Sequence, residues 1–570
     1  MGNELFGNYS IEKNHFLTGG HLNMWKIYKA VHKERKKPVC VFVFEKKGLD
    51  AYQHSEKEEL LNILRKEATS LMKFKHPNIL SIIEPLSEDK YSLGFVTENF
   101  DYSLSSWVNQ YKPSKIEIKL IITELCKTIS FLHHSCHIFH LNLNPDCIFI
   151  NGDNRLKIAG MNFAKECIGD KDTQFLYNLN TFSEVLNQNL NYVAPETVYK
   201  SKICRVSDIF SIGALIFYLL NHKSAHLIDL YKNTPENYKK IFNTIENRIK
   251  SIGIENKDDR DVIKLSLEEN ESKRLDIKGF SELEWFCDYK LKALTFIESL
   301  PTNDIVKNYE FLKQLPTMLE IFENKIIIKR FLPSLLSGLK IESLINPILP
   351  AIFAICEIPD IELNFEETIW PKLKELFKMN IIPAASLYFL LSKMTYIGEK
   401  ISPDEFSEHC IPIICKAMDC GVSKIQGVVV DNLSFVSNNI DAQIFSDKIY
   451  PRIIQILLHT NSSKLKKRLL TSIKNLFSLL DYNMINTVLV NDLEKLRKID
   501  NSSITSAGIE LIYEEIVEEV SIEVIRKKII PSLLSILIEG NISKDTYDRI
   551  TSLIQKYLDK LKKSREKVRI

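Results

Sequence analysis

The second half of the sequence repeats one short step, an apolar residue followed by proline. The step occurs at Leu332-Pro333, Trp370-Pro371, Ile411-Pro412, Tyr450-Pro451 and Ile530-Pro531, at intervals of about 40 residues except for a double interval before the last. Val490-Asn491 lies midway in that interval, with asparagine in the place of proline. Because proline is tolerated in the first turn of a helix, each step is expected to open a helical segment.

A period near 40 residues is typical of paired helices of the HEAT or armadillo type. Such pairs bury their apolar faces only by stacking on their neighbours. Residues 291–570 are therefore predicted to form an all-α HEAT/armadillo-type solenoid. A non-repetitive helical bundle with accidental prolines is the alternative.

Residues 1–290 have a different pattern. From Phe16 to about Phe100, short apolar stretches alternate with polar turns around one helical stretch, Glu56–Phe74. Beyond about Ile116, helical periods dominate, notably in Ile116–His133 and Asp208–Leu220. A small α+β lobe at about 1–100 and a larger, mainly helical lobe at about 101–290 are therefore predicted. A division into several domains is expected in any case, because 570 residues exceed what one hydrophobic core usually supports.

The motifs of this first region follow the order found in protein kinases. The stretch from Phe16 to Gly20 followed by Trp25 resembles the glycine-rich hairpin that covers nucleotide phosphates. Gly20, Leu22 and Trp25 then occupy its three glycine positions, and only the first is glycine. Since glycine is what allows the backbone to approach phosphate closely, the loop is degenerate.

The next two landmarks have lost a charge pair. In Val39-Cys-Val-Phe42, Phe42 stands where kinases place the lysine that holds the phosphates and pairs with a helix glutamate. Glu67 stands where that glutamate belongs. Lys46 or Lys47, from the same strand, is the alternative cation.

The catalytic loop keeps its frame but not its chemistry. The segment from His140 to Cys147 follows the H-R-D-L-K-P-E-N pattern, with Asn142 replacing the general base, Asn144 the lysine and Cys147 the metal-binding asparagine. Gly160 falls at the aspartate of the D-F-G loop, and a glycine cannot coordinate Mg²⁺. The sequence predicts a chain that is not an enzyme, with no cofactor and no metal site; a residual ATP-binding or weakly active kinase is the alternative.

Architectural residues persist beside these losses. His140 keeps the first position of the catalytic loop, and Asp208 begins the segment that resembles the central helix of the large lobe. Glu196, in Ala194-Pro195-Glu196, is expected to pair with Arg274, because a buried ion pair is costly to break. Together with Glu67, these residues predict a retained kinase scaffold.

The combination resembles the Scy-like pseudokinases, in which an inactive kinase domain precedes HEAT repeats. Gly19-Gly20, the run from Val41 to Lys47, and Leu190-Asn-Tyr-Val-Ala-Pro-Glu196 are most similar to the branch known as coated-vesicle-associated kinase. The resemblance implies a scaffold that binds clathrin, adaptors or other coat components in traffic between the trans-Golgi, endosomes and coated vesicles. The wider family also implies tRNA export, so a tRNA-export adaptor is a further alternative. Coat-binding members carry a long tail beyond the repeats whereas this sequence ends at Ile570, so direct clathrin binding through such a tail is not expected.

Composition limits the other classes of function. The net charge of +2 offers no global field for nucleic acid or an anionic membrane. The eleven cysteines include no C-x-x-C pair, and no run of about 18 apolar residues occurs. A cytoplasmic protein is expected, held at Golgi, endosomal or coated-vesicle membranes through its protein partners.

Overall fold

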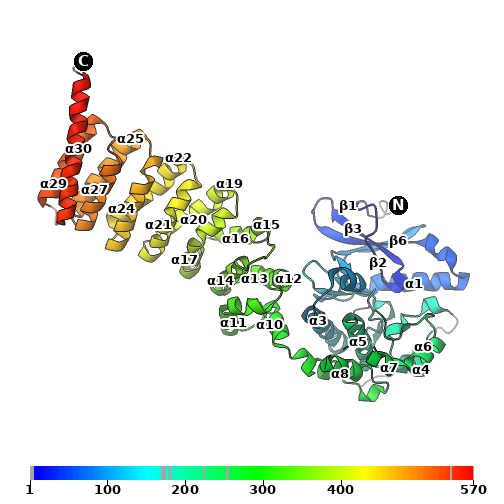
Figure 1. The fold of residues 1–570 in the computed structure, drawn as a ribbon. Helices are drawn as coiled ribbons and strands as arrows, with labels where there is room; N and C mark the ends of the chain where they lie inside the picture. Colours follow the sequence, from blue (N-terminus) through cyan, green and yellow to red (C-terminus); the bar gives the residue numbers. More distant parts are fainter. Residues whose placement is uncertain are drawn as a thin grey trace. The chain divides into compact units, whose positions relative to one another are not determined.

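The chain divides into two compact units (Figure 1). Unit 1 comprises Met1–Asn303 and Ile321–Ser334, and unit 2 comprises Asp304–Glu320 and Leu335–Ile570. The computed structural model describes residues 6–167, 175–176, 179, 183–221, 225–251, 254, 256–379, 381–539 and 542–568.

Unit 1 begins with an antiparallel sheet and one long helix. The strand order is β1-β3-β4-β6-β5, with β2 paired to β3. Along β4, Val39, Val41 and Val43 belong to a core cluster with Phe6 and Tyr9. Phe42, at an alternating position, turns to the other face, as the two-residue period of a strand requires. The elements are β1 (Tyr9–Ile11), β2 (Leu17–Gly19), β3 (Trp25–His32), β4 (Pro38–Glu45), α1 (His54–Leu71), β5 (Ile82–Glu88) and β6 (Ser92–Glu98).

The rest of unit 1 is mainly helical. A capping box between Ser114 and Glu117 starts α3 (Lys115–His134), which packs against the buried α5 (Arg205–Leu220). Two short strands, β8 (Ile138–Phe139) and β9 (Ile148–Ile150), flank the catalytic-loop segment. The remaining helices are α4 (Pro195–Lys200), α6 (Pro235–Phe242), α7 (Ile245–Ser251), α8 (Lys257–Ser266), α9 (Ile277–Ser281) and α10 (Tyr289–Glu298).

A buried arginine fixes the segment 321–334 inside unit 1. Arg330 is 2% exposed; its guanidinium lies 2.8 Å from Glu124 Oε1 and 3.0 Å from Glu298 Oε1. Glu124 comes from α3 and Glu298 from α10. Because a buried charge is tolerated only when it is paired, these three residues tie the segment to the helices of the large lobe.

Unit 2 is entirely helical where it is described, and its helices form two rows (Figure 1). In one row, α14, α17, α21, α24, α27 and α30 contact one another in sequence order, and in the other α20, α23 and α26 do so. This is the stacking expected of helical repeats. The bounds are α11 (Ile305–Met318), α14 (Ile345–Cys356), α16 (Trp370–Phe377), α17 (Ala384–Ser392), α20 (Ile411–Asp419), α21 (Ser423–Asn438), α23 (Tyr450–His459), α24 (Ser463–Leu476), α26 (Val490–Ile499), α27 (Ser503–Glu515), α29 (Ile530–Glu539) and α30 (Lys544–Val568).

The repeated prolines Pro371, Pro412 and Pro451 lie in the first turn of an α-helical segment, as expected, but at the last two that segment continues a preceding helical turn. Pro412, Pro451 and Pro531 each follow a five-residue π-helical turn, and Asn491 follows one too. Each turn is itself preceded by a short α-helical segment. The wider turn lets a residue without an N–H enter a continuous helical rod.

Within the described ranges, no helix is both long and apolar enough to cross a membrane.

Candidate functional site

The degenerate glycine-rich hairpin touches the catalytic loop. Gly19 pairs with Trp25 across the hairpin, and the Gly20 N–H donates to the Asp146 carbonyl at 2.9 Å. Gly20 has a φ of +70°, and a Cβ there would lie 2.5 Å from Trp25 Cδ1 and 2.7 Å from Glu67 Oε1. Leu22 points outward, 41% exposed. The hairpin is therefore held down against the large lobe at Gly20.

Trp25 donates to the helix glutamate. Its indole Nε1 donates to Glu67 Oε2 at 2.8 Å, and the His21 N–H donates to the same oxygen at 3.4 Å. Both Trp25 and Glu67 are buried. Burial raises the pKa of Glu67 to about 7, against the lowering effect of the two donors. The alternative cation Lys46 instead lies 2.7 Å from Glu88 Oε1.

Aromatic rings surround Phe42, at the position expected for lysine. The Phe42 ring stacks on Phe95 with centroids 4.6 Å apart, and meets Trp25 at 6.3 Å. Phe100 and Phe149 each lie 5.9 Å away. All five rings are buried, so the strand face below the hairpin is packed with carbon rather than lined with charge.

The catalytic loop is closed by amide hydrogen bonds. Asn142 Nδ2 lies 3.0 Å from both the Gly160 carbonyl and Asn162 Oδ1. Asn144 Nδ2 donates to Asn142 Oδ1 at 2.9 Å and lies 3.4 Å from Cys147 Sγ. These side chains are all at least 95% buried, and their polar atoms are used mainly on one another. Such a network holds the loop in shape without a charge.

Gly160 adopts a conformation that leaves no space for a side chain. Its φ is +73°, and a Cβ would lie 2.4 Å from Cys147 Sγ and 3.2 Å from Asn142 Nδ2. Burial raises the pKa of the Cys147 thiol well above its usual value. Neutral Cys147 thus occupies the volume that a carboxylate at position 160 would need.

The predicted architectural residues are paired. Asp208 accepts from the backbone N–H groups of His140 and Leu141 at 2.9 and 2.8 Å and lies 2.8 Å from His133 Nε2. Burial by itself would raise the pKa of Asp208, but His133 and His140 hold it below the usual range. The His140 ring lies 3.0 Å from the Ala159 carbonyl.

The second predicted pair, Glu196 with Arg274, is also in place. Arg274 Nη1 donates to Glu196 Oε1 at 2.9 Å, Nη2 contacts Oε2, and both side chains are fully buried. Ser207 donates to the same carboxylate at 2.7 Å. The ion pair therefore has the additional hydrogen bonds that a buried charge pair needs.

Most of the predicted positions lie together in one cluster. Gly20, Trp25, Phe42, Glu67, Asn142, Asn144, Cys147 and Gly160 are linked through the contacts above, whereas Glu196 and Arg274 lie deeper in the large lobe and Leu22 faces outward. Sequence reasoning missed Asn162 and the role of Trp25 as donor to Glu67. It also missed Arg330, for which the run Lys329-Arg330-Phe331 gave no signal of burial. No group of three metal-ligating side chains occurs among the residues that the structure describes.

The chain is similar to known kinases and kinase-like proteins. The protein kinase domain model matches residues 20–286. SCY1-like protein 2 of Homo sapiens is 25% identical over 98% of this chain and 62% of its own length. The probable inactive serine/threonine-protein kinase scy1 of Dictyostelium discoideum is 20% identical over 76% of this chain and 44% of its own. The chain thus spans about three fifths of the human relative.

A solved structure is similar in fold along nearly the whole chain. The crystal structure of Cex1p aligns with a TM-score of 0.51 at 15% identity, covering 98% of this chain and 97% of that one. The predicted fold class, a kinase-like α+β domain followed by an all-helical region, is confirmed. The branch proposed from the sequence is not resolved by these similarities.

Proposed function

We propose that this chain, one of the SCY1-like kinase-like proteins, works as a catalytically inactive scaffold. The observation that carries the proposal is the Trp25–Glu67 hydrogen bond at 2.8 Å. In a working kinase the corresponding glutamate orients a lysine toward the nucleotide phosphates. Here the glutamate is buried against an indole, and the lysine position carries Phe42.

The residues of the cleft do not fit a magnesium–nucleotide group. Kinases rely on positioning and on charge that compensates the transferring phosphoryl group. The positions that would supply that charge hold Phe42, Asn142, Cys147 and Gly160. Asp146 is a neighbouring carboxyl, but burial raises its pKa, which opposes the ionised form that Mg²⁺ binds.

The features that remain suit a binding role. The Glu196–Arg274 pair and the Asp208 contacts stabilise the large lobe without contributing to phosphate transfer. The stacked helices of unit 2 provide an extended surface, as solenoids generally do for partner proteins. The resemblance of the sequence motifs to the coated-vesicle-associated branch suggests coat and adaptor components of the trans-Golgi, endosomes and coated vesicles as the partners. On this proposal the protein is peripheral to those membranes and reaches them through its partners.

Affinity capture of the tagged full chain from cells tests the partner class. Clathrin-coat and adaptor proteins should be enriched over a tag-only control. A catch dominated by tRNA and its export factors would overturn the trafficking role in favour of an RNA adaptor.

A phosphate-transfer assay on the same preparation tests the lack of activity. No incorporation above background is expected. Incorporation by the wild-type chain that disappears in Asn142→Ala would contradict an inactive cleft, because it would assign a catalytic role to that residue.

A further inference from the structure

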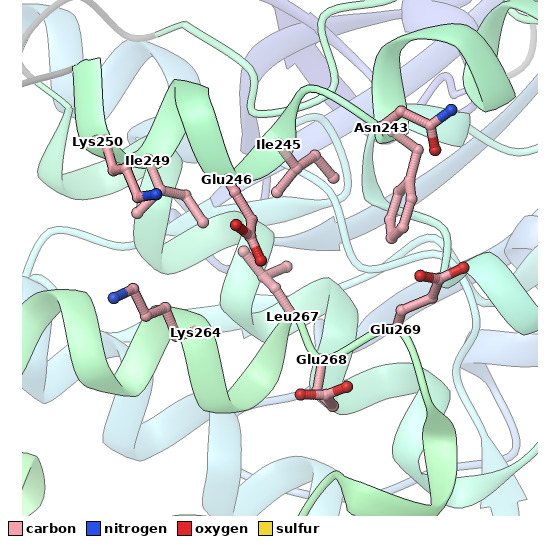
Figure 2. Close-up of a pocket in the computed structure, with 10 residues that line it drawn as sticks. Asn243, Ile245, Glu246, Ile249, Lys250, Lys264, Leu267, Glu268 and Glu269 are labelled. Carbon is pink, nitrogen blue, oxygen red and sulfur yellow. The ribbon is translucent and has the colours of Figure 1, made fainter.

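A cavity lies in the large lobe of unit 1, and none of the degenerate kinase positions lines it (Figure 2). It has a volume of about 570 Å³, within the range of ligand pockets. Helices α6, α7 and α8 and the segment after α8 surround it. Its floor is apolar and mostly buried, formed by Phe242, Ile245, Ile249 and Leu267.

The rim of this cavity carries basic side chains on one side and acidic side chains on the other. Figure 2 shows Lys250 and Lys264 together on one side, and Glu268 and Glu269 toward the other. Glu246 lies between them. Within the described part of the chain, none of these five side chains forms an ion pair within 4.0 Å. The rim therefore presents a positive end and a negative end that are free to bind opposite charges.

The retained kinase ion pair supports this cavity directly. Arg274 Nε donates to the Glu268 carbonyl at 2.8 Å, so the pair anchors the negative wall. The Arg274 guanidinium also lies 5.6 Å from the Phe210 ring, which stacks on Phe242 in the floor at 6.2 Å. The Glu196–Arg274 pair therefore supports both a wall and the floor of this cavity, in addition to its place in the core of the large lobe.

We infer that the cavity docks a short segment of a partner protein, in which apolar residues are flanked by an acidic residue on one side and a basic residue on the other. Apolar side chains would cover the floor, the acidic group would meet Lys250 and Lys264, and the basic group would meet Glu268 and Glu269. A purely apolar segment would leave the rim charges unused. A singly charged ligand would meet repulsion at one of the two ends.

Selection from a random linear peptide library on the purified full chain tests this inference. Wild-type protein should enrich peptides with the acidic–apolar–basic order. Their affinity, measured by fluorescence anisotropy, should fall about tenfold in the double variant Glu268→Lys/Glu269→Lys. Glu282→Lys, which reverses an exposed charge on the same unit outside the cavity, is the matched control and should bind like wild type.

Charge exchange separates recognition from damage to the fold. Replacing the basic residue of a selected peptide by glutamate should abolish binding to wild type and restore it to the double variant. The inference is overturned if no peptide is enriched, or if selected peptides bind wild type and the double variant equally. Neither result affects the nucleotide cleft, so the inactive-scaffold proposal is tested separately.

Discussion

Replacing Glu67 by glutamine should stabilise this protein above pH 7. In a working kinase the same change would remove the partner of the phosphate-binding lysine. Glu67 is buried and has an indole and a backbone N–H as its donors, and no residue that the structure describes pairs a cation with it. Its pKa is raised from 4.5 to about 7 by burial. Glutamine keeps the shape and accepts the Trp25 hydrogen bond without carrying a charge.

The sign and size follow from proton linkage. Between pH 4.5 and about 7, the folded chain retains a proton on Glu67 that the unfolded chain has released, so wild-type stability is lost as the pH rises through this window. This shift in the pKa of Glu67 corresponds to a loss of about 3 kcal/mol in the free energy of unfolding of the wild type above pH 7. The free energy of unfolding of Glu67→Gln relative to wild type should therefore increase by about 2–3 kcal/mol between pH 5 and pH 8. His21, whose pKa is lowered to about 4 by burial, titrates in both proteins and cancels in the difference.

Urea unfolding followed by tryptophan fluorescence measures this difference. Three of the four tryptophans, Trp25, Trp107 and Trp285, lie in unit 1, so the signal reports mainly on the unit that contains Glu67. Glu282→Gln, at an exposed position of the same unit, should show no such pH trend. If Glu67→Gln instead loses stability relative to wild type as the pH rises, an ionised Glu67 must have a cationic partner, and the reasoning is refuted.

Three further substitutions test the neighbouring contacts. Gly160→Asp should lower the free energy of unfolding by about 2–4 kcal/mol, because the new Cβ would clash with Cys147. Gly421 has a similar positive φ but no atom within 4 Å of its Cβ position, so Gly421→Asp should cost only about 1–2 kcal/mol. Equal losses would show that Cys147 does not crowd position 160. Asn142→Asp places a carboxylate beside the Gly160 carbonyl, so chemical denaturation should show a larger loss at pH 8 than at pH 5; a uniform loss would argue against a buried charge. Arg330→Met removes the cation that Glu124 and Glu298 share, leaving Glu298 with the more distant Arg155 at 3.8 Å, and should cost about 3–5 kcal/mol, with recovery when Glu124 and Glu298 also become glutamine. No change in stability on Arg330→Met would show that the cluster contributes nothing.

The sequence predicted the elements whose signals are local. The helix expected at Glu56–Phe74 is α1, His54–Leu71. The Glu196–Arg274 pair could be predicted because both residues lie in recognisable kinase motifs. These signals depend on spacing along the chain, which the sequence shows directly.

What the sequence missed depends on contacts between distant residues. Trp25 and Glu67 are joined only because the start of β3 meets α1, and no period in the sequence reports that contact. The sequence alone would place Arg330 at the surface as a basic residue. It is buried because α3 and α10 supply two carboxylates that pair with it. The π-helical turns before Pro412, Pro451 and Pro531 were also missed, because a proline in a first turn has the same sequence pattern with or without such a turn before it.

A nucleotide-dependent thermal shift of the full chain, with and without Mg²⁺, tests the inactive cleft most directly. A ligand at 100 times its dissociation constant stabilises a protein by about 2.7 kcal/mol, which a melting curve resolves. With Trp25, Phe42 and the amide network in place, neither ATP alone nor ATP with Mg²⁺ should raise the melting temperature. A rise that requires Mg²⁺ would show that the cleft opens and coordinates metal, and would contradict the account.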